Sequence, residues 1–177
     1  MAGGNTRSLL VHLPELIEVQ RLASHGAKGL VRVQELTMVR HKDLSLPVLA
    51  IEFGSQDPKA PVFFLTAGVH GLERIGTRVV ISYLKTLTNM AHWDPSTKAL
   101  LSRVRFSVIP IINPVGMYLG RRSNGNGVDL MRNAPIEADH KSGISIAAGH
   151  RISNHLPWFR GVEGSGMEIE AKAMISY

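Results

Sequence analysis

The residues of this sequence best suited to catalysis are His70 and Glu73, which stand three positions apart in the segment GVHGLE, residues 68–73. A neutral imidazole and a carboxylate are ligands that catalytic zinc uses, with one coordination position left open for water. At the start of a helix this spacing lets both side chains converge on one ion. The pair alone leaves a second interpretation open, in which His70 is an ordinary loop histidine and Glu73 is an acid favoured by the helix dipole.

The elements around this pair are predicted to place it at the edge of an α/β sheet. Residues 61–67 (PVFFLTA) form a continuous apolar run, which is typical of a buried central strand. Residues 73–87 then carry apolar side chains at helical spacing, and residues 104–112 form a second apolar strand. A strand–helix–strand order predicts a right-handed crossover, so His70 should follow the carboxyl end of a strand, where open α/β sheets bind ligands.

The remaining elements have weaker signals. A short amphipathic helix is predicted over residues 13–22, with Pro14 in its first turn. Two β-like runs, residues 30–39 and 46–53, are separated by polar residues and predict a hairpin. Short helices are predicted at residues 98–103 and 167–176, whereas residues 116–158 are rich in Gly, Asn, Arg and His without periodicity. Long irregular segments within a domain often carry function.

Two further motifs follow the second strand. Residues 113–116 (NPVG) predict a sharp turn, for which an ordinary strand exit is a sufficient explanation. Residues 120–133 (GRRSNGNGVDLMRN) place arginines on a glycine-rich loop. A guanidinium is a planar donor fork that suits a carboxylate or a developing oxyanion, although a solvated loop with charged tips would have the same composition.

Composition narrows the functional classes. The chain has no cysteine, so any metal must be held by His, Glu or Asp. The formal net charge is +6, but Lys and Arg are scattered, and the densest cluster, Arg121–Arg122, has no interleaved aromatic residues. This distribution predicts no nucleic-acid partner and is compatible with an anionic substrate. Neither a secretory signal nor an apolar run of about 18 residues is recognisable, so we expect a cytoplasmic protein without a membrane partner.

Taken together and in this order, the three motifs resemble the zinc carboxypeptidase family from residue 46 onward. The resemblance implies a single domain over residues 1–177 that is the N-terminal, truncated portion of an α/β/α carboxypeptidase-like fold, with a mixed, mostly parallel sheet and flanking helices. It implies one Zn²⁺ held by His70 and Glu73. It also implies that Arg122 stabilises the oxyanion and that Arg132, with Asn133 beside it, binds the substrate carboxylate.

The sequence departs from the family pattern in two respects. Met131 stands where the family has an asparagine, and a thioether cannot donate a hydrogen bond to a carboxylate. In addition, the family's third zinc ligand, a histidine after a later strand, and its general-base glutamate are not found. The histidines after the second predicted strand are His140, His150 and His155, and each lies in the irregular region, where a rigid ligand position is not expected.

These features predict a zinc-dependent hydrolase of amide bonds, related to metallocarboxypeptidases and inactive as this chain alone. Its substrate would be a peptide or an N-acyl amino acid. Two alternatives stay open: a deacylase of small N-acyl amino acids, and a non-catalytic binding protein or remnant that kept the scaffold. The sequence does not indicate an oligomeric state.

Overall fold

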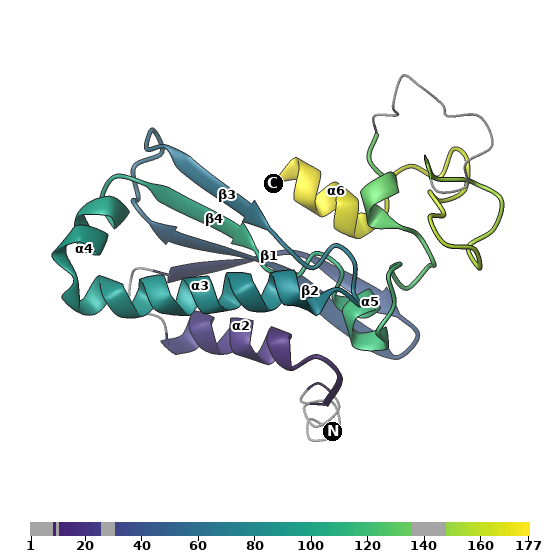
Figure 1. The fold of residues 1–177 in the computed structure, drawn as a ribbon. Coiled ribbons are helices and arrows are strands. Elements are labelled where there is room, and N and C mark those ends of the chain that lie inside the picture. The colour runs from purple at the N-terminus through teal and green to yellow at the C-terminus, as the bar shows by residue number, and fades with distance from the viewer. Residues whose placement is uncertain (1–8, 10, 26–30, 136–147) are drawn as a thin grey trace. The chain divides into compact units, whose positions relative to one another are not determined.

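The computed structural model describes residues 9, 11–25, 31–135 and 148–177. Figure 1 shows their helices and strands. The elements are α2 (Pro14–His25), β1 (Val31–His41), β2 (Leu44–Gly54), β3 (Val62–Thr66), α3 (Arg74–Trp93), α4 (Pro95–Leu101), β4 (Arg105–Ile109), α5 (Pro114–Leu119), the 3₁₀ helix η1 (Leu130–Arg132) and α6 (Ile169–Ser176).

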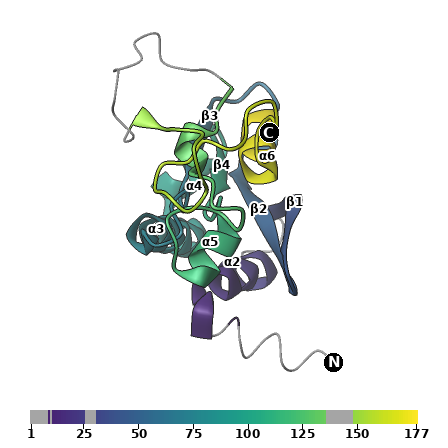
Figure 2. The same ribbon diagram turned by 90° about the vertical axis from the view of Figure 1, so that its right-hand side faces the viewer.

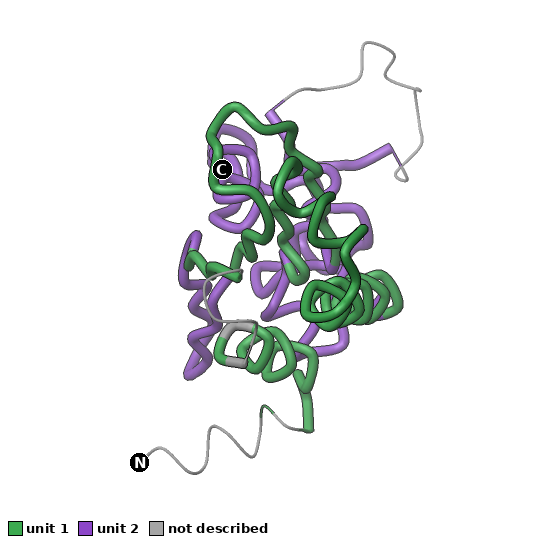
Figure 3. The backbone as a smooth tube through the Cα atoms, turned by 90° about the vertical axis from the view of Figure 1, so that its left-hand side faces the viewer, with its two compact units in different colours: residues 1–35, 49–67, 75–111 green, residues 36–48, 68–74, 112–177 purple. Residues whose placement is uncertain are grey.

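The chain is divided into two compact units (Figure 3). Unit 1 comprises residues 1–35, 49–67 and 75–111, and unit 2 comprises residues 36–48, 68–74 and 112–177. Unit 1 therefore holds β3, β4, the part of β2 that pairs with β4, and helices α2, α3 and α4. Unit 2 holds the loops that carry the candidate site. The expectation of one domain over residues 1–177 stays a prediction.

The four strands in the described part of the chain form one mixed sheet in the order β1-β2-β4-β3. β3 pairs with β4 in parallel, from Val62 opposite Arg105 to Thr66 opposite Ile109. β2 pairs with β4 antiparallel, with Ile51 opposite Val108. The predicted α/β class with a mixed sheet and flanking helices is thus confirmed. Fewer of these strands pair in parallel than we expected.

The position of β3 corrects one prediction. Its apolar run predicted a buried central strand, but β3 lies at the edge of this sheet, and Val62, Phe63 and Phe64 are 51%, 46% and 50% exposed. A continuous apolar sequence indicates that a strand is suited to burial on both faces. Burial also needs a neighbouring strand, which the local sequence does not specify.

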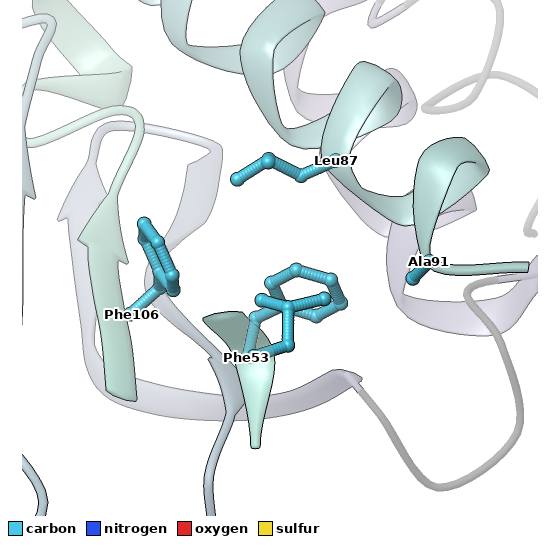
Figure 4. Packing of buried hydrophobic residues seen from close by; sticks show 5 residues of the cluster. Phe53, Leu87, Ala91 and Phe106 are labelled. Carbon is cyan, nitrogen blue, oxygen red and sulfur yellow. The ribbon is translucent and has the colours of Figure 1, made fainter. Parts of the chain in front are cut away.

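The core of unit 1 lies between the sheet and the helix that follows β3. Phe53 and Phe106 come from β2 and β4, and Leu87 and Ala91 come from α3 (Figure 4). The two phenyl rings are 6.3 Å apart and tilted by 55°, an arrangement favoured by their quadrupoles. As the helical spacing of its apolar residues predicted, α3 covers the sheet with one face.

Helices α2 and α3 run side by side in unit 1 (Figures 1 and 2). Leu13, Leu16 and Val19 are at most 2% exposed, as an amphipathic helix requires. Arg78 of α3 donates to Glu15 at 3.0 Å, which ties the two helices together. The helix predicted for residues 13–22 is confirmed and runs on to His25. None of the helices that the structure describes is long and apolar enough to cross a membrane.

Candidate metal and substrate site

His70 and Glu73 meet in unit 2, on the loop that leads into α3. The Nδ1 atom of His70 lies 3.2 Å from the Oε1 atom of Glu73. The other ring nitrogen, Nε2, lies 3.3 Å from the Oδ1 atom of Asp129. His70 is 9% exposed and therefore largely buried. Both of its ring nitrogens are held by protein carboxylates.

The spacing of these donor atoms fits a metal. Two ligands of a tetrahedral zinc ion, each about 2.05 Å from it, lie about 3.3 Å from each other. The 3.2 Å between His70 Nδ1 and Glu73 Oε1 agrees with that value. Asp129 takes the opposite nitrogen, as outer carboxylates do beside metal-bound histidines. The described residues contain no group of three or more His, Cys, Asp or Glu side chains that could hold a metal, so the pair fits part of a ligand shell.

Asp129 is the centre of the site, a role that the sequence did not predict. Its side chain is 1% exposed. Its Oδ1 atom faces His70 and accepts from the backbone N–H of Met131 at 3.1 Å. Its Oδ2 atom accepts from Arg122 Nε at 3.0 Å and from Arg132 Nη1 at 3.1 Å. The only signal for this role was its place between the two arginines of the loop motif.

Arg122 and Arg132 therefore converge on one buried carboxylate. Arg122 also reaches the pair of His70 and Glu73, because its Nη1 atom donates to Glu73 Oε1 at 2.9 Å. The side chains of Arg122 and Arg132 remain 32% and 25% exposed, so parts of both guanidinium groups are accessible to solvent. The structure thus brings together four residues for which roles were predicted: His70, Glu73, Arg122 and Arg132.

Asn133 does not join this cluster. Its Nδ2 atom donates to the carbonyl of Arg160 at 2.8 Å, and its Oδ1 atom accepts from the backbone N–H of Glu168 at 2.5 Å. The residue is 5% exposed. Because both polar atoms hold backbone segments of unit 2, the substrate-binding role that the resemblance implied for Asn133 stays a prediction.

Asn113, whose motif predicted only a sharp turn, connects the site loops. Its Oδ1 atom accepts from the N–H of Gly116 at 2.8 Å and so caps α5. Its Nδ2 atom donates to the carbonyls of Val69 and Arg122 at 3.2 and 3.4 Å. This fully buried amide therefore links the backbone next to His70 with the backbone of Arg122.

The later histidines differ in their surroundings. In His150, Nδ1 accepts from the N–H of Ile152 at 3.1 Å, Nε2 lies 2.8 Å from the carbonyl of Pro157, and the ring packs on Phe159. Both nitrogens thus serve the loop structure. His155 is exposed. His140 lies outside the described residues.

Asn124 connects the arginine loop with α6. Its Oδ1 atom accepts from the N–H groups of Asn126 and Val128, each at 3.0 Å. Its Nδ2 atom donates to Glu168 at 2.8 Å and lies 3.3 Å from the nearer carboxylate oxygen of Glu170. Glu170 is 1% exposed. Burial raises the pKa of the Glu170 carboxyl, and the nearby charge of Glu168 acts in the same direction.

We expect Glu170 to oppose folding as pH rises. The pKa of Glu170 is higher in the folded than in the unfolded chain. Glu170 therefore makes its full contribution to stability when the pH is below its ordinary pKa of 4.5. That contribution is lost as pH rises from there through the raised pKa. Glu170→Gln keeps an acceptor for Asn124 and removes the charge. Urea unfolding from pH 4.5 to 8 should show the variant gaining stability relative to wild type as pH rises. A difference that does not vary with pH would contradict this.

Comparison with known proteins shows the family to which the chain belongs. The zinc carboxypeptidase family model matches residues 29–177. The chain belongs to the zinc carboxypeptidase family. The match begins before residue 46, where the motifs first suggested the resemblance, and it includes β1, β2 and both site loops.

The relatives of this chain include proteins named as carboxypeptidases and as amidases. Carboxypeptidase SOL1 of Arabidopsis thaliana is 29% identical over 121 residues, which are 67% of this chain and 25% of that protein. Murein peptide amidase A of Escherichia coli (strain K12) is 38% identical over 82 residues, which are 46% of this chain and 28% of that protein. The chain thus spans about a quarter of the length of these relatives.

Solved structures support the fold. A metallo-carboxypeptidase from Burkholderia cenocepacia matches with a TM-score of 0.53 and 26% identity, over 65% of this chain and 31% of that one. Bovine thrombin-activatable fibrinolysis inhibitor matches with a TM-score of 0.65 over 96% of this chain and 54% of that one. The identity to the bovine protein is 17%, so this likeness concerns the fold alone.

Proposed function

We propose that this chain carries the first part of the active site of a zinc-dependent hydrolase of amide bonds. One observation carries the proposal: His70 Nδ1 and Glu73 Oε1 lie 3.2 Å apart, while Asp129 holds the opposite ring nitrogen of His70. This arrangement fixes the imidazole orientation and directs two metal-type donors at one point. Family membership supports it, since the family is that of zinc carboxypeptidases.

In this proposal His70 and Glu73 hold a single Zn²⁺ ion. When bound, zinc supplies Lewis-acid polarisation of the amide carbonyl and activates water. Arg122 is positioned beside Glu73 and is held through its Nε atom by Asp129. Its exposed N–H groups can therefore donate to an oxygen that gains negative charge next to the metal ligands, at little reorganisation cost.

Arg132 is proposed to bind the carboxylate of a peptide or N-acyl amino acid substrate. Its neighbour Met131 is 59% exposed and offers no donor to such a group. A deacylase of small N-acyl amino acids is the second candidate; because its substrate carries the same carboxylate, Met131 weakens this contact for both candidates alike. The 38% identity to a protein named as an amidase is compatible with either. A cytoplasmic location and the absence of a nucleic-acid partner remain predictions from the sequence.

Zinc titration of the 177-residue chain tests the proposal. With two ligands of a tetrahedral shell, affinity should be far weaker than that of a closed site. His70→Ala should weaken zinc binding further, by about tenfold or more, because one of the two ligands is lost. Isothermal titration calorimetry of both proteins measures the change.

The matched control is His155→Ala, which removes an exposed histidine of the same unit. Zinc affinity should be unchanged in this variant. Tight, stoichiometric binding that survives His70→Ala would place the ligands elsewhere and overturn the assignment. Hydrolysis of a peptide or N-acetyl amino acid by the chain alone would show that its own residues complete the site, contrary to our expectation of inactivity.

A further inference from the structure

A small cleft in unit 2 opens beside Arg122 and is separate from the residues proposed to hold zinc. Its volume is about 310 Å³, at the lower end of the range for small-molecule sites. Its walls include Arg121, Arg122, Asp129, His155, Leu156 and Trp158. Because Arg122 also contacts Glu73, a group in this cleft would lie next to the amide bond that the proposed site would cleave.

The cleft has an excess of positive charge. The carboxylate of Asp129 is already matched by Arg122 and Arg132. In contrast, within the part of the chain that the structure describes, the Arg121 guanidinium has neither a hydrogen bond nor an ion pair. Arg121 is exposed and lines the cleft. A guanidinium in this position is suited to a carboxylate, which it can bind in a bidentate manner.

The lining of the cleft also has apolar residues, one of which, Trp158, has an unusual backbone conformation. Trp158 has a φ of 68°, a region that bulky residues rarely adopt. Its carbonyl accepts from the N–H of His150 at 3.2 Å, and Phe159 next to it accepts from the N–H of Asp129 at 2.8 Å. Backbone strain that is maintained by its surroundings is concentrated at functional sites. Here the strained residue, Trp158, lines the same cleft as Arg121 and Arg122.

We propose that this cleft binds an acidic residue of the substrate, with Arg121 pairing with its side-chain carboxylate and Trp158 packing against its methylene groups. The inference rests on the proposed hydrolase function and adds a substrate class to it: peptides or acyl amino acids with a carboxylate next to the cleaved bond. This contact differs from the one proposed for Arg132, because Arg132 does not line the cleft.

Binding of two matched peptides tests the proposal. The probes are acetyl-glutamyl-alanine amide and acetyl-glutaminyl-alanine amide, so the glutamate side chain carries the only carboxylate. In a Trp93→Phe background Trp158 is the sole tryptophan, and its fluorescence reports binding at the cleft. With protein freed of metal on a chelating resin, the glutamyl probe should bind at least about tenfold more tightly than the glutaminyl probe.

Arg121→Gln should bring this preference close to one, and Arg121→Lys should retain part of it. Arg103→Gln, which removes an exposed arginine of unit 1, should leave it unchanged. Equal affinities, no binding of either probe, or a preference that survives Arg121→Gln would overturn the proposal. So would inorganic phosphate binding as tightly as the glutamyl probe, since the cleft would then be a general anion site.

The zinc titration and this experiment can fail separately. The peptide measurements are made without metal, so the absence of zinc binding would leave the glutamyl preference intact. Conversely, normal zinc binding without a glutamyl preference would overturn the substrate class alone.

Discussion

Asp129→Ala should destabilise unit 2 by about 3–5 kcal/mol, the usual cost of removing one partner from a buried charge network. The variant would leave Arg122 and Arg132 without the carboxylate that both now contact at 3.0 and 3.1 Å. His70 would lose the partner of its Nε2 atom as well. Hydrogen exchange over residues 121–133, measured by mass spectrometry, should therefore show strongly reduced protection.

Two further variants separate charge from structure. Glu163→Ala removes an exposed carboxylate of the same unit and should change stability by less than about 0.5 kcal/mol. Asp129→Asn keeps the shape of the side chain and should lower zinc affinity by about tenfold to a hundredfold, because the orientation of His70 is less well fixed. Equal hydrogen exchange in Asp129→Ala and Glu163→Ala would mean that Asp129 is not the centre of this network.

Gly71→Ala should prevent unit 2 from reaching its native packing. A Cβ atom at this position would lie 2.1 Å from the carbonyl carbon of Gly116 and 2.2 Å from the backbone nitrogen of Met117. Both are backbone atoms, so no side-chain rotation can relieve the overlap. Overpacking in a core typically costs about 1–3 kcal/mol, and a backbone clash should exceed this range. Urea unfolding and the near-ultraviolet circular dichroism of the chain measure the loss.

The matched control is Gly76→Ala in α3. The nearest atom to a Cβ at this position is the Cβ of Ala67, at 4.0 Å, so no clash arises. Alanine is preferred to glycine in a helix by up to about 1 kcal/mol, and the variant should be neutral or slightly more stable. If Gly71→Ala were as stable as Gly76→Ala, the loop carrying His70 could not lie against α5 as described.

The candidate site was predicted only in part from the sequence. The glycine-bounded segment after an apolar strand indicated His70 and Glu73, because short spacing within one loop limits where two side chains can point. The central position of Asp129 was missed, since it depends on a contact between residues 59 positions apart. The hydrogen bonds of Asn133 to the backbone of Arg160 and Glu168 were not indicated by the sequence either, and its substrate-binding role stays a prediction.

The fold, like the site, was predicted from local sequence in some parts and decided by contacts between distant residues in others. The sequence by itself determined the hairpin of β1 and β2, the amphipathic helices α2 and α3, and membership of the zinc carboxypeptidase family, because periodicity and motif order are carried by neighbouring residues. Only the tertiary structure decided that β3 lies at the edge of the described sheet and that one buried carboxylate holds two arginines and a histidine. Such features depend on which distant segments meet, and local propensity does not encode the free energy of those contacts.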